Sequence, residues 1–217
     1  MKRKIILSLS LSFLMSLTSF PVEAIEDKNS AYNLTYEFEA WKDETICRIT
    51  GVSDHSVKEL FIPAQIDGLD VVCTENVFFE CSELEKITVD EQSKYMLSED
   101  GVLFISGFRT DGYELVAYPR GKIDTEYTIP KGTYLLNSEY AFRMCMNLKT
   151  VNLPDQEALN SVPCLFTLCY NLEEINGTMQ TISAPIYGPQ KLNKMSLGGQ
   201  IYAIDLSDYT NLKHLTI

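Results

Sequence analysis

Histidine is scarce in this chain of 217 residues, which contains only His55 and His214. The chain also lacks the His-Glu-x-x-His and Cys-x-x-Cys spacings of zinc sites and the Gly-x-Ser-x-Gly turn that presents a nucleophilic serine. A cysteine nucleophile would need a histidine as its base. We expect His55 in an N-terminal loop and His214 on an outward strand position, both at the surface. The sequence therefore predicts no enzymatic function and no cofactor or metal.

Long apolar runs are also missing beyond the first two dozen residues. Residues 1–24 have a basic start, an apolar stretch and a Val-Glu-Ala ending, which together are typical of a secretory signal peptide cleaved before Ile25. A transmembrane anchor is the alternative, but the run is short, rich in serine and ends at Pro21. No later stretch approaches the roughly 18 apolar residues of a membrane span. We expect a secreted protein with no membrane insertion after cleavage.

Basic residues are outnumbered, with 18 Lys and Arg against 30 Asp and Glu, so the formal net charge is −12. This balance argues against nucleic acid or an anionic membrane as the partner. The acidic clusters at 90–91 and 98–101 lack the alternating oxygen ligands of a calcium loop and are interpreted as solvated turns. An extracellular protein or glycan is the expected partner, and its identity is not encoded in the charge.

A repeat is what the sequence does contain. The pattern apolar-x-x-apolar-x-apolar starts at residues 57, 84, 124, 148, 172, 192 and 212, and its clearest copies are 84–89, 148–153, 192–197 and 212–217. Steps of about 20–29 residues are typical of a leucine-rich solenoid, whose units bury their apolar rows against their neighbours. The pattern predicts such a solenoid over 57–217, preceded by an N-terminal capping region over 25–56.

Within one repeat, the side chains of Ile87 and Val89 point to the same side of a strand because the strand period is two. A second signature precedes the repeat, with an aromatic residue and a cysteine spaced three residues apart: Phe78 and Cys81, Phe142 and Cys145, Phe166 and Cys169. That spacing indicates a short helical turn. We therefore predict an α/β fold with short helical turns and one parallel sheet. The sheet is expected to stack Leu60, Ile87, Tyr127, Val151, Ile175, Met195 and Leu215.

One step between repeats is 40 residues long and contains an insertion at about 100–120. Residues 102–106 and 114–118 are short β-rich runs, and the loop between them carries Asp111 and Gly112. The sequence therefore predicts an inserted β-hairpin.

These segments carry a family resemblance. The Ile-Pro-Ala-Gln-Ile-Asp-Gly stretch at 62–68, the Phe-x-x-Cys-x-x-Leu units, the hairpin from Asp100 and the Tyr-Pro-Arg-Gly stretch at 118–121 together resemble the BspA-type leucine-rich repeats. The resemblance covers about 36–217. It implies a bacterial surface or secreted protein used in adhesion or protein binding, with no shared catalytic residues. The chain departs from the family pattern at Asp124, Gly177, Pro189 and Tyr209.

Six cysteines in a secreted chain invite a disulfide framework. Cys81, Cys145 and Cys169, however, hold the small buried position of the repeat, where stacked copies are interpreted as reduced core residues. We extend this interpretation to Cys73. The state of Cys47 and Cys164 stays open.

The outward strand positions are where a solenoid normally binds. The candidate binding surface consists of Phe61, Lys86, Thr88, Glu126, Thr128, Thr150, Asn152, Glu174 and Asn176. Opposite charges are expected on adjacent coils at 59/86, 86/126 and 174/194. Such a charge ladder also has a purely structural explanation, in which each exposed pair stabilises the sheet by about a few tenths of a kcal/mol.

Two functions remain. One is binding or adhesion through the solenoid surface, and the other is a structural spacer that belongs to a larger surface protein. The chain stops at Ile217 inside a repeat and shows no polar cap, so we expect a fragment of a longer protein or an open edge that pairs with something else.

Overall fold

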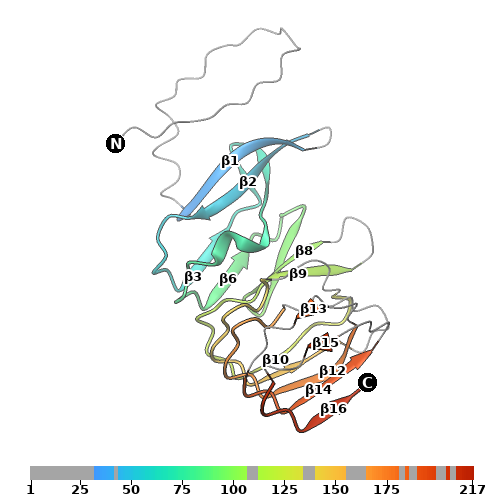
Figure 1. Ribbon diagram of the computed structural model, residues 1–217. Helices are drawn as coiled ribbons and strands as arrows, with labels where there is room; N and C mark the ends of the chain where they lie inside the picture. The colour runs from blue at the N-terminus through green and yellow to red at the C-terminus, as the bar shows by residue number, and fades with distance from the viewer. Residues whose placement is uncertain are drawn as a thin grey trace.

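The computed structural model describes residues 32–41, 44–106, 112–133, 140–154, 165–180, 184–185, 190–198, 204–205 and 209–217. The expected signal peptide, Asp111 and Cys164 lie outside the described residues. The chain forms a stack of coils, with an N-terminal hairpin at one end and the last repeat at the other (Figure 1). Within the described ranges no helix is long and apolar enough to cross a membrane.

The C-terminal part of the stack is a five-stranded parallel sheet. Its strands, in spatial order, are β10 (Glu126–Thr128), β11 (Thr150–Asn152), β12 (Glu174–Gln180), β14 (Lys194–Gly198) and β16 (His214–Thr216). Tyr127 is opposite Val151 and Val151 is opposite Ile175, as the repeat predicts. A smaller parallel pair, β13 (Ala184–Pro185) and β15 (Ile204–Asp205), lies beside it. The repeat spacing therefore gives the correct parallel register here.

The first two repeats form a separate parallel sheet. Strand β3 (Glu59–Ile62) pairs with β6 (Lys86–Val89), and Leu60 is opposite Ile87. β6 does not pair with β10. The predicted single sheet through all seven repeats is therefore wrong, because the sheet is broken between the second and third repeats.

The insertion explains this break. The insertion contains β8 (Val102–Ser106) and β9 (Tyr113–Ala117). Together with β7 (Met96–Glu99), which directly precedes the insertion, they form an antiparallel sheet in the order β7-β8-β9. The predicted hairpin corresponds to β8 and β9, while β7 is an additional strand. Its β7–β8 turn lies against β6, where the backbone N–H of Ile87 donates to the carbonyl oxygen of Gly101 at 2.9 Å. A backbone N–H group of β6 is thus hydrogen-bonded to the β7–β8 turn.

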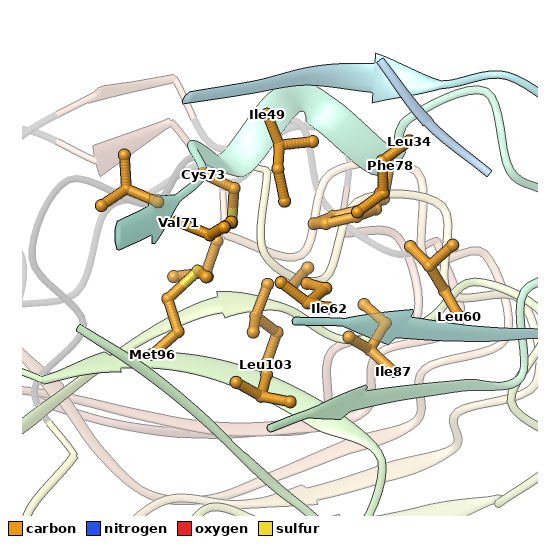
Figure 2. Close-up of a cluster of buried hydrophobic side chains, with 14 of the residues drawn as sticks. Leu34, Ile49, Leu60, Ile62, Val71, Cys73, Phe78, Ile87, Met96 and Leu103 are labelled. Carbon is orange, nitrogen blue, oxygen red and sulfur yellow. The ribbon is translucent and has the colours of Figure 1, made fainter. Parts of the chain in front are cut away.

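A four-stranded sheet covers the N-terminal end. Strands β1 (Leu34–Trp41) and β2 (Glu44–Val52) form an antiparallel hairpin, β2 pairs in parallel with β5 (Leu69–Val72), and β5 pairs with β4 (Gln65–Ile66). Figure 2 shows Leu34 and Ile49 from the hairpin facing Leu60, Ile62 and Ile87 from the first repeats. These side chains are buried in one hydrophobic cluster. The hairpin therefore covers the core at the end of the stack.

The aromatic residues that precede each repeat are buried, but they lie in turns. Phe78 ends the 3-10 helix η2 (Glu75–Phe78), whereas Phe142 and Phe166 lie in hydrogen-bonded turns. Each carbonyl of these three residues accepts a hydrogen bond from the cysteine N–H three residues later. The described residues contain almost no helix, so the predicted α/β class and helical turns are not confirmed. The fold is a β-solenoid.

Four aromatic rings continue through successive coils. Phe142 packs against Phe166 with ring centroids 5.1 Å apart, against Tyr118 at 5.4 Å and against Tyr127 at 6.0 Å. Tyr118 occupies the aromatic position in the coil formed by the insertion. The Phe-x-x-Cys pattern does not identify it, because Gly121 stands where the cysteine would be.

The interpretation as reduced core residues is confirmed for Cys73, Cys81, Cys145 and Cys169, and Cys47, whose state the sequence leaves open, is found in the same state. Cys47, Cys73, Cys81, Cys145 and Cys169 are buried and free. The thiol of Cys169 donates to the carbonyl oxygen of Phe142 at 2.8 Å, and that of Cys145 donates to Tyr118 at 3.8 Å. Sulfur thus links the coils of Cys145 and Cys169 to the coils that precede them. Burial raises the pKa of both Cys47 and Cys73 to about 12.

We expect the buried thiols to be unreactive in the folded protein, because the reactive thiolate is disfavoured by burial. The measurement is the reaction of a Cys164→Ser variant with Ellman's reagent at neutral pH, before and after denaturation. Rapid colour development should require denaturant. Rapid labelling of the folded variant would contradict the burial of the core thiols.

Candidate functional site

The outward face of the parallel strands presents short polar side chains. Alternation places Tyr127 and Val151 in the core and leaves the flanking residues of the same strands pointing outward. Of the predicted surface, Phe61, Lys86, Thr88, Glu126 and Thr128 are exposed, whereas Thr150, Asn152, Glu174 and Asn176 are half-buried. The inside and outside assignment made from the sequence is therefore correct for these strands.

A chain of side-chain hydrogen bonds runs across this face. Nδ2 of Asn152 donates to Oε1 of Glu126 at 2.8 Å and to Oγ1 of Thr128 at 3.0 Å. Nδ2 of Asn176 then donates to Oδ1 of Asn152 at 2.9 Å. Nζ of Lys194 continues the chain by donating to Oδ1 of Asn176 at 2.7 Å. The face is thus held in place by its own side chains from β10 to β14.

The break between β6 and β10 opens a pocket on the same face. Its volume is about 540 Å³, and its polar lining includes Glu59, Lys86, Thr88, Asp100, Lys122 and Asp124. The ammonium group of Lys122 lies 2.8 Å from the Asp124 carboxylate and 3.6 Å from that of Asp100, and its side chain is only 13% exposed. The pocket therefore has a fixed ion-pair network on one wall and exposed strand residues on the other.

The predicted binding residues fall into three groups. Phe61 is 44% exposed and lies near Tyr32, with ring centroids 6.3 Å apart. Lys86 and Thr88 line the pocket at the sheet break. The remaining predicted residues belong to the five-stranded sheet, from β10 to β12. The predicted neighbour relation between Lys86 and Glu126 is wrong, because β6 and β10 are not paired.

Sequence reasoning missed the other wall of this pocket. The sequence pattern indicates a solvated turn at Asp100 and a degenerate leucine position at Asp124. Both carboxylates lie within 4 Å of the Lys122 ammonium group at the break. The sequence does contain a signal for this wall. Lys122 lies two residues before Asp124 and can form an ion pair with it, at the position where the repeat normally has leucine.

An asparagine ladder along the turns was also missed. Asn147, Asn171 and Asn211 each directly precede a repeat leucine. Their side-chain amides donate to backbone carbonyls of the preceding coil: Asn147 to Lys122 at 3.0 Å, Asn171 to Met146 at 2.7 Å and Asn211 to Gln190 at 2.7 Å. These amides satisfy backbone groups and hold the coils in register, which is a structural role. The recurrence of asparagine directly before the repeat leucine is the sequence signal that could have identified this ladder.

Reactive groups are dispersed in the described part of the chain. His55 is exposed and lies 3.3 Å from the carboxylate of Glu80, while His214 is exposed on β16. No group of three or more His, Cys, Asp or Glu side chains among the described residues is arranged to hold a metal ion. The geometry that stands out is a rigid polar face with a pocket, which is suited to binding.

Comparison with solved structures finds proteins that are similar to this chain. A leucine-rich repeat protein from Eubacterium ventriosum aligns with a TM-score of 0.50 and 21% identity, over 75% of this chain and 49% of that protein. A leucine-rich cell-surface protein from Faecalibacterium prausnitzii aligns with a TM-score of 0.48 and 21% identity, over 74% of this chain and 48% of that one. The pneumococcal vaccine antigen PcpA aligns with a TM-score of 0.46 and 23% identity, over 74% of this chain and 35% of that protein.

The similarity to the Eubacterium protein shows that the chain has a leucine-rich repeat fold. The chain spans less than half the length of each of these three structures. No family model matches the sequence, and no curated protein matches it.

Proposed function

We propose that this chain is a secreted or cell-surface protein of the BspA-type leucine-rich repeat class, which binds another protein through the outward face of its strands. The observation that carries this proposal is the pocket of about 540 Å³ at the sheet break, on the face that the solenoid presents to solvent. The signal-like segment at 1–24 supports export. The cell-surface description of the Faecalibacterium structure fits the same location.

The geometry supports recognition by shape and polar contacts. Side chains fixed by neighbouring hydrogen bonds lose little conformational entropy on binding, which favours affinity. Lys86 and Thr88 stand exposed beside the ion-paired Lys122, so a partner can insert a polar side chain between them. A glycan is the alternative partner, since the same hydroxyl, amide and carboxylate groups bind sugars.

A structural spacer is the second candidate function, and the hydrogen-bond chain from Glu126 to Lys194 favours it. These side chains already satisfy one another across β10 to β14. In a spacer this face would bind nothing, and the ladder would only stabilise the sheet.

We expect Thr88→Arg to weaken partner binding at least tenfold, because the long cationic side chain fills the pocket at the sheet break. The purified protein is screened on an array of extracellular proteins and glycans, and hits are titrated. Thr74→Arg is the matched control, because Thr74 is exposed before η2 and its side chain makes no capping hydrogen bond. Equal losses in both variants, or a hit unaffected by Thr88→Arg, would contradict the assignment to this face. No hit on the array would favour the spacer.

A further inference from the structure

Two arginines from successive coils lie over one aromatic ring on the turn side of the solenoid. The guanidinium carbon of Arg143 is 4.8 Å from the centroid of the Phe79 ring, and that of Arg120 is 5.3 Å from the same centroid. Arg143 also lies 5.2 Å from the ring of Tyr140. Phe79 is 38% exposed, so the cluster reaches the surface. Stacking on aromatic rings holds both guanidinium planes in defined orientations.

These arginines have no carboxylate partner in the part of the chain that the structure describes. Arg120 donates through Nη1 to the backbone carbonyl of Phe79, and no described acidic side chain forms an ion pair with Arg120 or Arg143. The Nε atoms of both arginines are buried without a hydrogen-bond partner among the described residues. A buried charged donor without an acceptor is costly, so an added acceptor oxygen at this cluster would stabilise both arginines.

The local shape admits an acceptor of a particular size. A cavity of about 20 Å³ lies between the coils, and its lining includes Phe79, Arg120, Tyr140 and Arg143. A space of that size holds one water-sized group. One oxygen of an anion fits inside, while the rest of the anion lies at the mouth. The guanidinium fork matches the two oxygens of a carboxylate.

We propose that Arg120 and Arg143 bind a carboxylate in an acidic peptide segment of a partner protein, with Phe79 and Tyr140 packing against the neighbouring apolar side chain of that peptide. A long polyanion fits less well, because the site offers two cations in a chain of net charge −12 that would repel further negative charge. The site is built by the turns and is distinct from the outward strand face. It does not depend on the function proposed for that face.

The test uses the full chain and two pools of fluorescein-labelled peptides. One pool has a central Glu-Glu pair with randomised flanks, and the other has Gln-Gln at the same place. Fluorescence anisotropy should show binding of the Glu-Glu pool only, and the Arg120→Gln, Arg143→Gln double variant should bind at least tenfold more weakly. The double Arg→Lys variant keeps both charges but loses the fork, so it should also bind more weakly than the original chain.

Controls separate this site from general electrostatics and from loss of folding. Lys213→Gln removes one exposed cation from the last coil and should leave binding unchanged. Thermal melting identifies any arginine variant that fails to fold. In that case Phe79→Leu is tested instead. This variant should bind the Glu-Glu peptides more weakly, because the stacking ring is lost. Equal binding of both peptide pools, or full affinity in the arginine or Phe79 variants, would overturn the proposal. Preferential binding of a sulfated heparin hexasaccharide or of inorganic phosphate would also overturn the peptide assignment.

Discussion

Phe142→Ala should reduce the free energy of unfolding by about 3–5 kcal/mol, the range for truncation of a buried phenylalanine. The Phe142 side chain is fully buried and packs against rings from the coils on both sides, Tyr118 and Phe166. Truncation leaves a cavity in the middle of this stack, and the rigid coils on either side limit its collapse. Urea denaturation followed by circular dichroism gives the change in stability.

The damage should be local, because contacts in a solenoid are between neighbouring coils. Hydrogen exchange should therefore accelerate in β10, β11 and β12 more than in the N-terminal β1–β2 hairpin. Phe61→Ala is the matched control. Phe61 is 44% exposed, and its truncation should change stability by no more than about 0.5 kcal/mol. A large loss for Phe61→Ala with a small one for Phe142→Ala would reverse the assignment of inside and outside.

The strand register could be predicted from the sequence because two independent signals agree on it. The period of two places Tyr127, Val151 and Ile175 inside, and the constant spacing of the repeat places them opposite one another. The position of each of these residues depends only on its own strand and on the neighbouring strand. Nearest-neighbour architecture therefore makes local patterns sufficient for this part of the fold.

The break in the sheet could not be predicted, because it depends on a tertiary backbone contact between β6 and the β7–β8 turn. The step of 40 residues between repeats reveals an insertion, but not where its turn will lie. In the structure the Gly101 carbonyl accepts the N–H of Ile87, which ties the turn to β6. The pocket beside Lys122 is a consequence of this contact and has no repeat pattern of its own.

The predicted helical turns are not confirmed, and the physical reason is a different one. A spacing of three residues between Phe142 and Cys145 fits an α-helical turn, a 3-10 turn and an isolated β-turn equally well. Met144, between them, has a positive φ of 62°, which is incompatible with a right-handed helix. The apolar spacing determines which side chains are buried together. The backbone conformation between them depends instead on how tightly the coil must turn.

Gly121→Ala should be the second strongly destabilising change, with an expected loss of about 2–3 kcal/mol, toward the upper end of the usual range for overpacking. Gly121 lies where the insertion rejoins the stack, and its N–H donates to the carbonyl oxygen of Leu84 at 2.8 Å. A Cβ at this position would lie 2.5 Å from the carbonyl carbon and oxygen of Glu83 and 2.9 Å from the oxygen of Leu84. The obstacle is backbone, so the coils must separate to make room.

The matched control is Gly68→Ala, which separates steric contact from backbone strain. Gly68 has a φ of +79° with nothing within 4 Å of the added Cβ, so alanine there should cost only the left-handed conformation, about 1–2 kcal/mol. Urea denaturation should therefore rank Gly121→Ala as the less stable variant. Hydrogen exchange should locate its effect at the junction of β6 and β10, because the lost hydrogen bond to Leu84 joins those coils. If Gly68→Ala were the more damaging of the two, the coils beside Glu83 would be packed less tightly than the structure indicates.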